Sequence, residues 1–257
     1  MELYVVDAFT DRAFAGNPAG VVLLDGPVDD GWMQAVAAEM KHAETAFVRI
    51  DGEGDDPLPL RWFTPVAEVD LCGHATLATA HVLGGGRRFA TRSGVLTCTA
   101  DNGWVEMDFP ADPAEPIEVT TPLRAGLPGV TVRAVARAVS DVLVEAASAD
   151  EVRELRPDFA ALAEVPGRGV IVTAAGDRPG LDVVSRCFYP SYGVPEDSVT
   201  GSAHCTLASW WSPRLGRANL LAEQASARGG LVRTTVDQDR VRLAGQAVTV
   251  IQGRLIV

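Results

Sequence analysis

The fold of this protein is decided by the stretch CGHATLA at residues 72–78, because a similar stretch, TGSAHCTLA at residues 200–208, follows it later in the chain. In both stretches a glycine opens an apolar segment, and the two glycines, Gly73 and Gly201, lie 128 positions apart in a chain of 257 residues. A short segment that ends in proline precedes each glycine, RWFTP at 61–65 and RCFYP at 186–190. A repeat at about half the chain length indicates an internal duplication.

A second pair of segments repeats in the same order. Residues 94–107 and residues 230–243 both begin with glycine, alternate apolar and polar side chains, and turn at a polar tip, DNG or DQD. Alternation around such a tip predicts a β-hairpin in each half. Two matches in the same order favour a duplicated domain over chance similarity.

The boundary between the two halves is predicted from proline content. Residues 109–129 contain five prolines, and proline continues neither a helix nor a central strand. We therefore predict a linker there and two domains, 1–114 and 115–248, with the return of 249–257 to the first half left open. The active site is expected in the cleft between the two halves.

The segments after the two glycines predict buried helices. Residues 75–83 have almost no polar face before the triple glycine at 84–86, and residues 203–211 have the same character. A helix that is apolar nearly all round is buried on all sides. An amphipathic helix is expected at 29–40, and short strands at 4–8, 20–24, 46–50, 60–64, 169–173 and 182–188. The predicted fold class is α+β, with two pseudo-symmetric halves that each wrap a curved, mostly antiparallel sheet around a central buried helix.

Composition excludes several classes of protein. The chain has 22 basic and 34 acidic residues, a net charge of −12, which disfavours nucleic acid and anionic membranes as partners. No apolar run approaches the roughly 18 residues of a membrane helix, and the first residues lack the basic region of a signal peptide, so a cytoplasmic location is expected. The four cysteines are widely spaced, which argues against a disulfide framework and a structural zinc site. The acidic stretch 51–56 is expected to be a solvated hairpin tip.

Two helix starts could bind an anion. The first amides of a helix have no internal partners, and the helix dipole places partial positive charge there. If the halves are related by a pseudo-twofold axis, the helix starts at Gly73 and Gly201 would face each other and receive a carboxylate. The alternative is that each glycine only forms a tight turn before a packed helix.

Four side chains near these helix starts could carry the chemistry. A carboxyl group buried between domains, such as Glu44, has a raised pKa and can remove and return a proton; the alternative is an exposed loop or strand-edge glutamate. His74 could be catalytic or could simply hydrogen-bond a loop carbonyl. Asp197 could act on a substrate or cap the second helix, and Ser202 adds a hydroxyl beside Gly201.

Several ordered motifs then resemble one family. ETAFV at 44–48, CGHAT at 72–76, EDSVTGSAH at 196–204, SARGG at 226–230 and the pair Asn17-Pro18 resemble the phenazine biosynthesis PhzF-like isomerases, and the resemblance runs from residue 4 to residue 255. It implies the diaminopimelate-epimerase-like fold, and it implies neither a metal nor an organic cofactor. With exposed strand edges, it also suggests a homodimer.

The resemblance assigns roles to individual residues. It implies that Glu44 is the general acid/base. It implies that His74 and Asp197 take part in catalysis by holding or polarising the substrate. It implies that substrate binding, including that of the carboxylate, uses Asn17, Gly73, Gly201 and Ser202.

Competing functions depend on other residues. A related two-thiol epimerase or racemase would use Cys72, but the repeat aligns Cys72 with Thr200, and a threonine hydroxyl is no thiolate-like base; Cys205 is expected in the core. A metal site formed by the histidines at 74, 81 and 204 lacks a ligand motif. A non-catalytic protein that binds small acids would keep the carboxylate site without needing Glu44.

The function predicted from the sequence is therefore a cofactor-independent isomerase, active in a biosynthetic pathway. It would move a proton and a double bond on a small carboxylate-bearing substrate, a cyclic or unsaturated amino or hydroxy acid.

Overall fold

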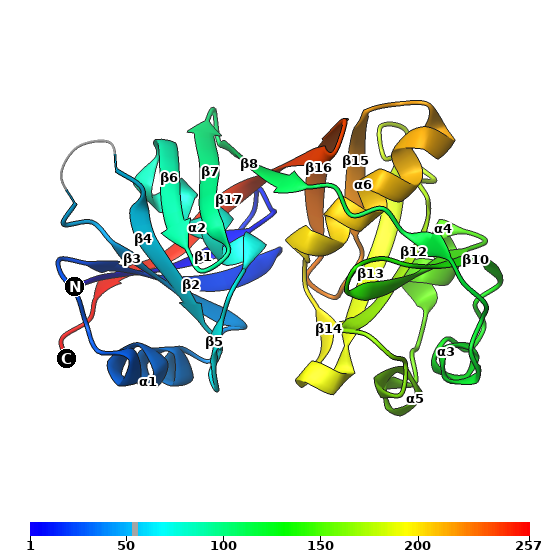
Figure 1. Ribbon diagram of the computed structural model, residues 1–257, viewed down its shortest axis with the longest axis horizontal. Coiled ribbons are helices and arrows are strands. Elements are labelled where there is room, and N and C mark those ends of the chain that lie inside the picture. The colour runs from blue at the N-terminus through cyan, green and yellow to red at the C-terminus, as the bar shows by residue number, and fades with distance from the viewer. Residues whose placement is uncertain (53–55) are drawn as a thin grey trace. The chain divides into compact units, whose positions relative to one another are not determined.

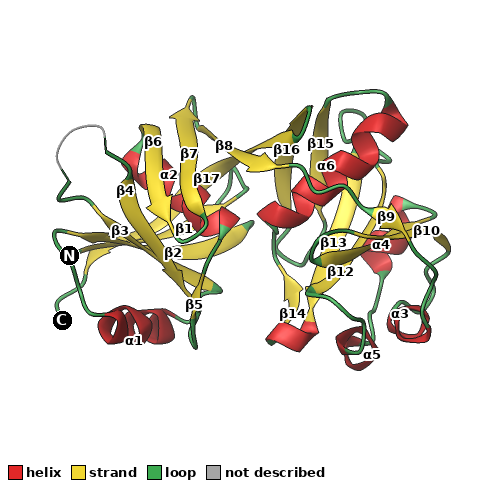
Figure 2. Ribbon diagram, viewed as in Figure 1, coloured by secondary structure: helices red, strands yellow, loops and turns green. Residues whose placement is uncertain are grey.

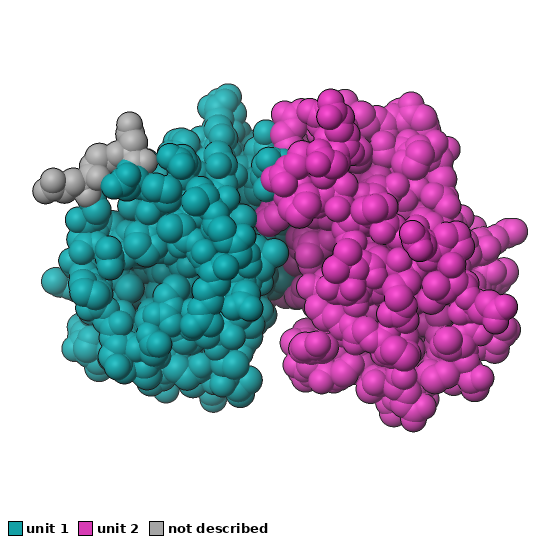
Figure 3. Space-filling model, in the orientation of Figure 1, with its two compact units in different colours: residues 1–108, 244–257 teal, residues 109–243 magenta. Residues whose placement is uncertain are grey.

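The chain divides into two compact units (Figure 3). The computed structural model describes residues 1–52 and 56–257. Unit 1 comprises Met1–Asp108 and Ala244–Val257, and unit 2 comprises Phe109–Leu243. The chain enters unit 2 within strand β8 (Trp104–Pro110) and returns to unit 1 within strand β17 (Arg240–Arg254). The hairpin tip expected at 51–56 falls partly outside the described residues.

Unit 1 is built mainly from strands (Figures 1 and 2). Besides β8 and β17, its elements are β1 (Glu2–Ala8), β2 (Asn17–Leu24), α1 (Asp30–Met40), β3 (Glu44–Arg49), β4 (Leu58–Phe63), β5 (Glu68–Val69), α2 (Gly73–Leu83), β6 (Gly85–Thr91) and β7 (Gly94–Asp101). The strands pair in the order β17-β1-β2-β3-β4-β6-β7-β8. The pairs β2–β3 and β4–β6 are parallel, and the other pairs β17–β1, β1–β2, β3–β4, β6–β7 and β7–β8 are antiparallel. Because β8 also pairs with β17, these strands close into a barrel.

Helix α2 is buried over its first two turns. Every residue from His74 to Ala80 is buried, and the helix packs against β1, β2, β3, β6 and β7. The sequence predicted this burial from the absence of a polar face, and the contacts of the helix agree with that prediction. The helix ends at Gly84, whose φ is 66°, a conformation that favours glycine.

Helix α1 packs on the sheet through one face. Met33, Val36 and Ala37 are buried in a cluster with Phe47 and Phe63, whose rings meet edge to face with centroids 5.6 Å apart. Asp29 caps the helix by accepting hydrogen bonds from the Gly31 and Trp32 amides, so a side chain satisfies two of its free amides.

Unit 2 has the same kind of architecture. Its elements are β9 (Glu115–Pro116), α3 (Thr121–Gly126), β10 (Val132–Arg137), β11 (Asp141–Ala146), α4 (Ala149–Glu154), α5 (Phe159–Ala163), β12 (Gly169–Ala175), β13 (Val183–Tyr189), a 3₁₀ turn (Pro190–Tyr192), β14 (Val194–Asp197), α6 (Gly201–Leu215), β15 (Asn219–Gln224) and β16 (Gly230–Asp237). The strands pair in the order β9-β10-β11-β12-β13-β15-β16, and the pairs β11–β12 and β13–β15 are parallel.

The two units share one pattern of strand pairing. In unit 1 an antiparallel pair, β1–β2, is followed by parallel β3, antiparallel β4, parallel β6 and antiparallel β7. Unit 2 repeats this sequence of pairings with β10, β11, β12, β13, β15 and β16. The helices α2 and α6 occupy the same place in the two orders, after a short strand (β5 or β14) and before β6 or β15.

An arginine in each unit repeats one set of contacts. The Arg61 guanidinium binds both carboxylate oxygens of Glu68 at 2.7 Å and lies 5.2 Å from the Phe63 ring centroid. In unit 2, Arg186 binds both oxygens of Glu196 at 2.7 and 2.9 Å and stacks in the same way on the ring of the second residue after it. Because the same bidentate pair and stack recur, the duplication extends to side-chain contacts.

The predicted linker is wrong in part. Residues 121–126 form helix α3, and the side chains of Leu123 and Leu127 lie in the hydrophobic core of unit 2. Pro122 is in the first turn of this helix, where a missing N–H costs nothing and the fixed φ suits a helix. The high proline content of this segment therefore reflects the start of a helix as well as the passage of the chain from unit 1 to unit 2.

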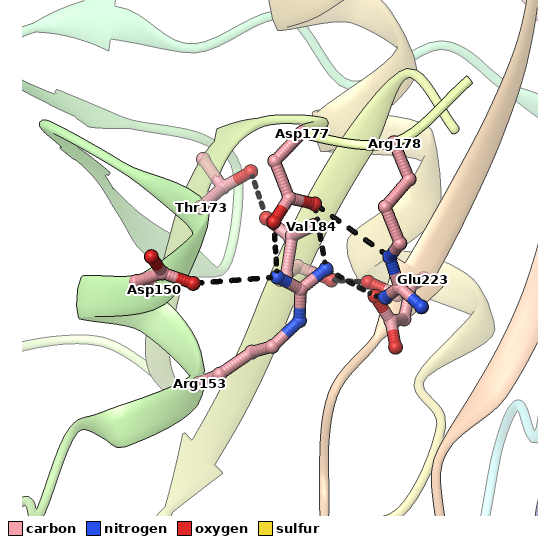
Figure 4. A network of polar contacts seen from close by, with 8 residues as sticks. Asp150, Arg153, Thr173, Asp177, Arg178, Val184 and Glu223 are labelled. Carbon is pink, nitrogen blue, oxygen red and sulfur yellow. Dashed lines mark hydrogen bonds and ion pairs between the residues drawn. The ribbon is translucent and has the colours of Figure 1, made fainter. Parts of the chain in front are cut away.

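A polar network joins α4 to β15 in unit 2 (Figure 4). Arg153 on α4 donates to Asp177 at 2.7 Å and to Glu223 of β15 at 2.8 Å, and Arg178 also donates to Glu223.

Among the described residues, no helix is long and apolar enough to span a membrane.

Candidate active site

Glu44 and Asn17 lie at the same end of two neighbouring strands. Glu44 opens β3 shortly after α1 ends at Met40, and Lys41, with a φ of 56°, caps the helix. Ala19 of β2 is opposite Glu44 in the parallel register, and Asn17 lies two positions earlier. Asn17 is 1% exposed and the Glu44 side chain is 21% exposed. Glu44 is therefore partly buried at a strand start and is not an exposed loop residue.

His74 lies between a carboxylate and a thiol. Its Nε2 is 3.4 Å from Glu44 Oε2, and its Nδ1 is 3.5 Å from Cys72 Sγ. Burial lowers the pKa of His74, while the Glu44 charge raises it and His42 lowers it further. The imidazole is neutral at pH 7 as a result. It is buried, and its Nε2 has no hydrogen-bond partner among the described residues.

The start of α2 lacks a side-chain cap. Cys72 is the N-cap residue, with extended backbone angles, and its side chain makes no capping hydrogen bond. A serine, threonine or aspartate at this position would normally accept from the first amides. The amides of the first turn, beginning with Gly73, thus keep the donor character and positive potential that suit an anion.

The start of α6 in unit 2 is organised around a threonine. Thr200, its N-cap residue, makes no capping hydrogen bond and instead donates its hydroxyl to Asp197 Oδ2 at 2.5 Å. The Thr200 amide donates to Gln224 Oε1 at 2.8 Å, and Gln224 Nε2 donates to the Asp197 carbonyl at 2.8 Å. Gln224, which is fully buried, therefore fixes both Asp197, the last residue of β14, and the residue before Gly201.

Ser202 is held by an ion pair from elsewhere in unit 2. Arg168 Nη2 donates to Ser202 Oγ at 2.9 Å, and the same guanidinium binds both oxygens of Asp141, which is 1% exposed. The guanidinium also lies 5.1 Å from the ring centroid of Tyr189. Because the Ser202 oxygen accepts from Arg168, its own proton points away from that guanidinium.

Sequence reasoning missed Gln224 and the Arg168–Asp141 pair. Gln224 lies two positions before Ser226, where the motif SARGG begins, so its place near a matched motif was the one available signal. Arg168 and Asp141 lie 27 positions apart in segments without a repeat or motif, and nothing in the sequence singled them out.

The other histidines and cysteines have separate roles. His204 Nδ1 lies 2.8 Å from the Thr200 carbonyl, and burial lowers the pKa of His204 to about 4, so a neutral ring donates to that carbonyl. His81 Nε2 lies 3.1 Å from Thr249 Oγ1. Burial raises the pKa of Cys98 to about 12 and also raises that of Cys187, and Cys205 is buried in α6.

Comparison with known proteins identifies the family. The model of the phenazine biosynthesis-like protein family, PhzC-PhzF, matches residues 6–253. An uncharacterized isomerase of Halalkalibacterium halodurans is 46% identical over 264 residues, with 99% of this chain and 98% of that protein covered. The crystal structure of a PhzF-family protein from Enterococcus faecalis is 38% identical, with a TM-score of 0.94 and 100% and 99% of the two chains covered.

More distant structures share the fold alone. A hydroxyproline epimerase from Agrobacterium vitis matches with a TM-score of 0.63 at 10% identity, over 99% of this chain and 90% of that one. The relation to epimerases expected from the sequence is therefore confirmed at the level of the fold. From the family match and the full-length relatives, the chain belongs to the PhzC-PhzF family of phenazine biosynthesis-like proteins and is an isomerase.

Proposed function

We propose that this isomerase moves a proton, and with it a double bond, on a small carboxylate-bearing substrate, with Glu44 as the general acid/base and no cofactor. The observation that carries the proposal is the position of the Glu44 carboxylate, partly buried and 3.4 Å from the buried Nε2 of a neutral His74. A carboxylate with restricted solvent contact is a stronger base than one in bulk water.

The proposed reaction needs no co-reactant. Glu44 as carboxylate removes a proton from one carbon of the substrate, so that a C–H bond breaks and an O–H bond forms. The electron pair left on the substrate shifts the double bond, and the Glu44 carboxyl then returns the proton to another carbon. Each turnover regenerates the Glu44 carboxylate, and neither oxidant nor reductant is consumed.

The remaining site residues are assigned to binding and polarisation. We assign the substrate carboxylate to the uncapped amides that begin at Gly73 and Gly201 and to the Ser202 hydroxyl, since these groups are donors. His74 and Asp197 are assigned to polarising or orienting a heteroatom of the substrate, and Asn17 to a further polar contact. The participation of both halves in one site stays a prediction of the sequence.

The substrate class is a small cyclic or unsaturated amino or hydroxy acid, and the setting is a biosynthetic pathway in the cytoplasm. The burial of α2 and of most of α6 supports the interpretation that each sheet curves around a central helix.

We also propose a homodimer, which light scattering would report as twice the 27.1 kDa of one chain. A mass of one chain at micromolar concentration would contradict the dimer.

Turnover of a substrate panel by the E44Q variant tests the proposal. General acid/base catalysis typically contributes about 10²–10⁴-fold, so E44Q is expected to lower kcat by about that factor while ligand binding changes much less. The matched control is E39Q, which removes an exposed carboxylate from the end of α1 five positions away. Full turnover by E44Q on the panel would favour a different base or a non-catalytic binding protein.

One observation favours a second candidate, an epimerase or racemase that uses Cys72. Cys72 Sγ lies 3.5 Å from His74 Nδ1 at a helix N-terminus, where the dipole favours a thiolate. Against it, the position aligned with Cys72 in unit 2 is Thr200. The C72A variant distinguishes the candidates, since this route would lose all turnover with the thiol.

A further inference from the structure

Three side chains in unit 1 form a group with the composition of a transition-metal site. Glu44, Cys72 and His74 each offer one ligand atom, and these atoms all lie within 4.8 Å of one another. Two of the three come from the first residues around the start of α2, and the third from the start of β3. A strand and a helix that pack together thus hold the group in place.

One ligand atom of this group, His74 Nε2, makes no hydrogen bond with the described residues. The His74 side chain is only 7% exposed, and its Nε2 is buried without a hydrogen-bond partner among the described residues. Buried polar atoms are nearly always satisfied, so such an atom calls for an explanation. The ring nitrogen lies 3.4 Å from Glu44 Oε2, close enough for both atoms to bind one ion.

One distance between ligand atoms already suits a small tetrahedral ion, and all three atoms lie within 4.8 Å of one another. Bonds from zinc to sulfur, nitrogen and oxygen of about 2.0–2.3 Å place tetrahedral ligand atoms roughly 3.3–3.6 Å apart. The Nε2–Oε2 distance of 3.4 Å already meets this value. Cys72 Sγ lies 3.5 Å from Nδ1, the other ring nitrogen, so the thiol must rotate toward Nε2 when the ion binds.

The ligand types select among metals. A thiolate with an imidazole prefers zinc and similar ions, whereas magnesium and calcium prefer oxygen ligands alone. Three protein ligands leave a fourth tetrahedral position for water, as in zinc sites that are open to solvent or substrate. On binding, Cys72 loses its S–H proton to solvent, and no oxidation or reduction takes place.

We propose that Glu44, Cys72 and His74 bind one Zn²⁺ ion and that the bound ion inhibits the isomerase. The inhibitory part rests on the proposed function, because a carboxylate that coordinates zinc is no longer available as the general base. Zinc would then act as a reversible inhibitor and not as a cofactor.

Titration of the purified chain with Co²⁺ and Zn²⁺ tests the site without any substrate. We expect one Co²⁺ per chain with a sulfur-to-cobalt charge-transfer band, displaced by Zn²⁺ and unaffected by Mg²⁺ or Ca²⁺. C72A should abolish the band, and H74N and E44Q should each weaken Zn²⁺ binding by at least about 100-fold, since even outer partners of a metal site change affinity 10–100-fold.

Matched controls come from the same unit. C98S removes another buried cysteine, H81N removes another histidine of α2, and E39Q removes an exposed carboxylate; all three should bind Zn²⁺ as the wild type does. Absence of the charge-transfer band in the wild type, or its loss in C98S, would overturn the site. Circular dichroism of each variant shows whether it is folded.

The inhibitory part has a separate test. On a substrate that the panel identifies, Zn²⁺ should inhibit the wild type at the concentration that fills the site, and a chelator should restore activity. Zinc binding without inhibition would overturn the inhibitory role and leave the site standing. Loss of activity in metal-free E44Q, by contrast, reports on the proposed base alone, so the two hypotheses can fail independently.

Discussion

Two buried histidines at helix starts differ in what their ring nitrogens contact. His204 lies 2.8 Å from the carbonyl of Thr200 through Nδ1, so it fixes the first turn of α6. His74 instead lies between Cys72 and Glu44. The Nε2 atoms of both rings have no hydrogen-bond partner among the described residues, but only that of His74 lies beside a carboxylate, Glu44 Oε2 at 3.4 Å. A buried polar atom without a partner lowers stability, which is acceptable at a site that binds a ligand.

The pH dependence of stability follows from these rings. The pKa of His204 falls from 6.5 in the unfolded chain to about 4 in the folded protein, so the unfolded state binds the proton more readily. The contribution of neutral His204 to the free energy of unfolding is fully present above pH 6.5 and is lost as the pH falls from 6.5 to about 4. The loss for this group amounts to roughly 3 kcal/mol. His74 acts in the same direction.

Urea unfolding of wild type and H204N at several pH values measures this effect. The free energy of unfolding of the wild type should fall more steeply between pH 6.5 and 4 than that of H204N, whatever their stabilities at pH 7. Equal slopes would show that His204 is protonated to the same extent in the folded and unfolded states.

At the scale of elements, contacts close in sequence could be predicted and distant ones could not. The hairpin of β7 and β8 and the burial of α2 follow from alternation and from apolar composition, which are local properties. The contact between Cys72 and His74 is also local, because both residues belong to one sequence motif. Arg168, Asp141 and Gln224 reach the start of α6 only through the pairing of β11, β12, β13 and β15, which sequence patterns do not specify.

Gly103 in the β7–β8 turn can be compared with Gly86 in strand β6. Asn102 and Gly103 have φ of 49° and 77°, as in the two-residue turns preferred in hairpins. Nothing lies within 4 Å of a Cβ added at Gly103 or at Gly86 of β6, and only Gly103 has a positive φ. G103A should therefore lower the free energy of unfolding by about 1 kcal/mol, whereas G86A should leave it unchanged or raise it by about 0.4–1 kcal/mol. Equal effects in denaturant titrations would contradict the role of the backbone.

The Arg168–Asp141 pair connects β11 and β12 to the start of α6. R168M leaves the buried Asp141 charge without its partner, which should cost about 2–4 kcal/mol, somewhat less than a fully buried pair because the Arg168 side chain is 35% exposed. The double variant R168M with D141N removes both charges and should be more stable than R168M alone.

Chemical denaturation of the single and double variants measures this coupling. R156M, which removes an exposed arginine of the same unit, should change stability by no more than about 0.5 kcal/mol. A double variant less stable than R168M would show that the orphaned charge is not the source of the loss.

At the scale of the whole molecule, duplication explains why the fold of one half could be predicted from the fold of the other half. The strand pairings of unit 1 recur in unit 2, and so does the bidentate arginine–glutamate pair. The candidate site does not repeat in this way. Unit 1 has Glu44, Cys72 and His74 near its helix start, whereas unit 2 has Asp197, Thr200 and Ser202 near the start of α6. This asymmetry favours one acid/base group over two equivalent thiols.

Deuterium incorporation in D₂O tests the central claim, that Glu44 carries the proton, most directly. Wild type, E44Q and C72A are compared on unsaturated cyclic amino and hydroxy acids, and the position of the label is read by NMR. We predict that E44Q incorporates deuterium about 10²–10⁴-fold more slowly than wild type, while C72A remains within a few-fold of it. Full incorporation by E44Q, or complete loss in C72A with its fold intact, would contradict the account and assign the proton transfer to the thiol.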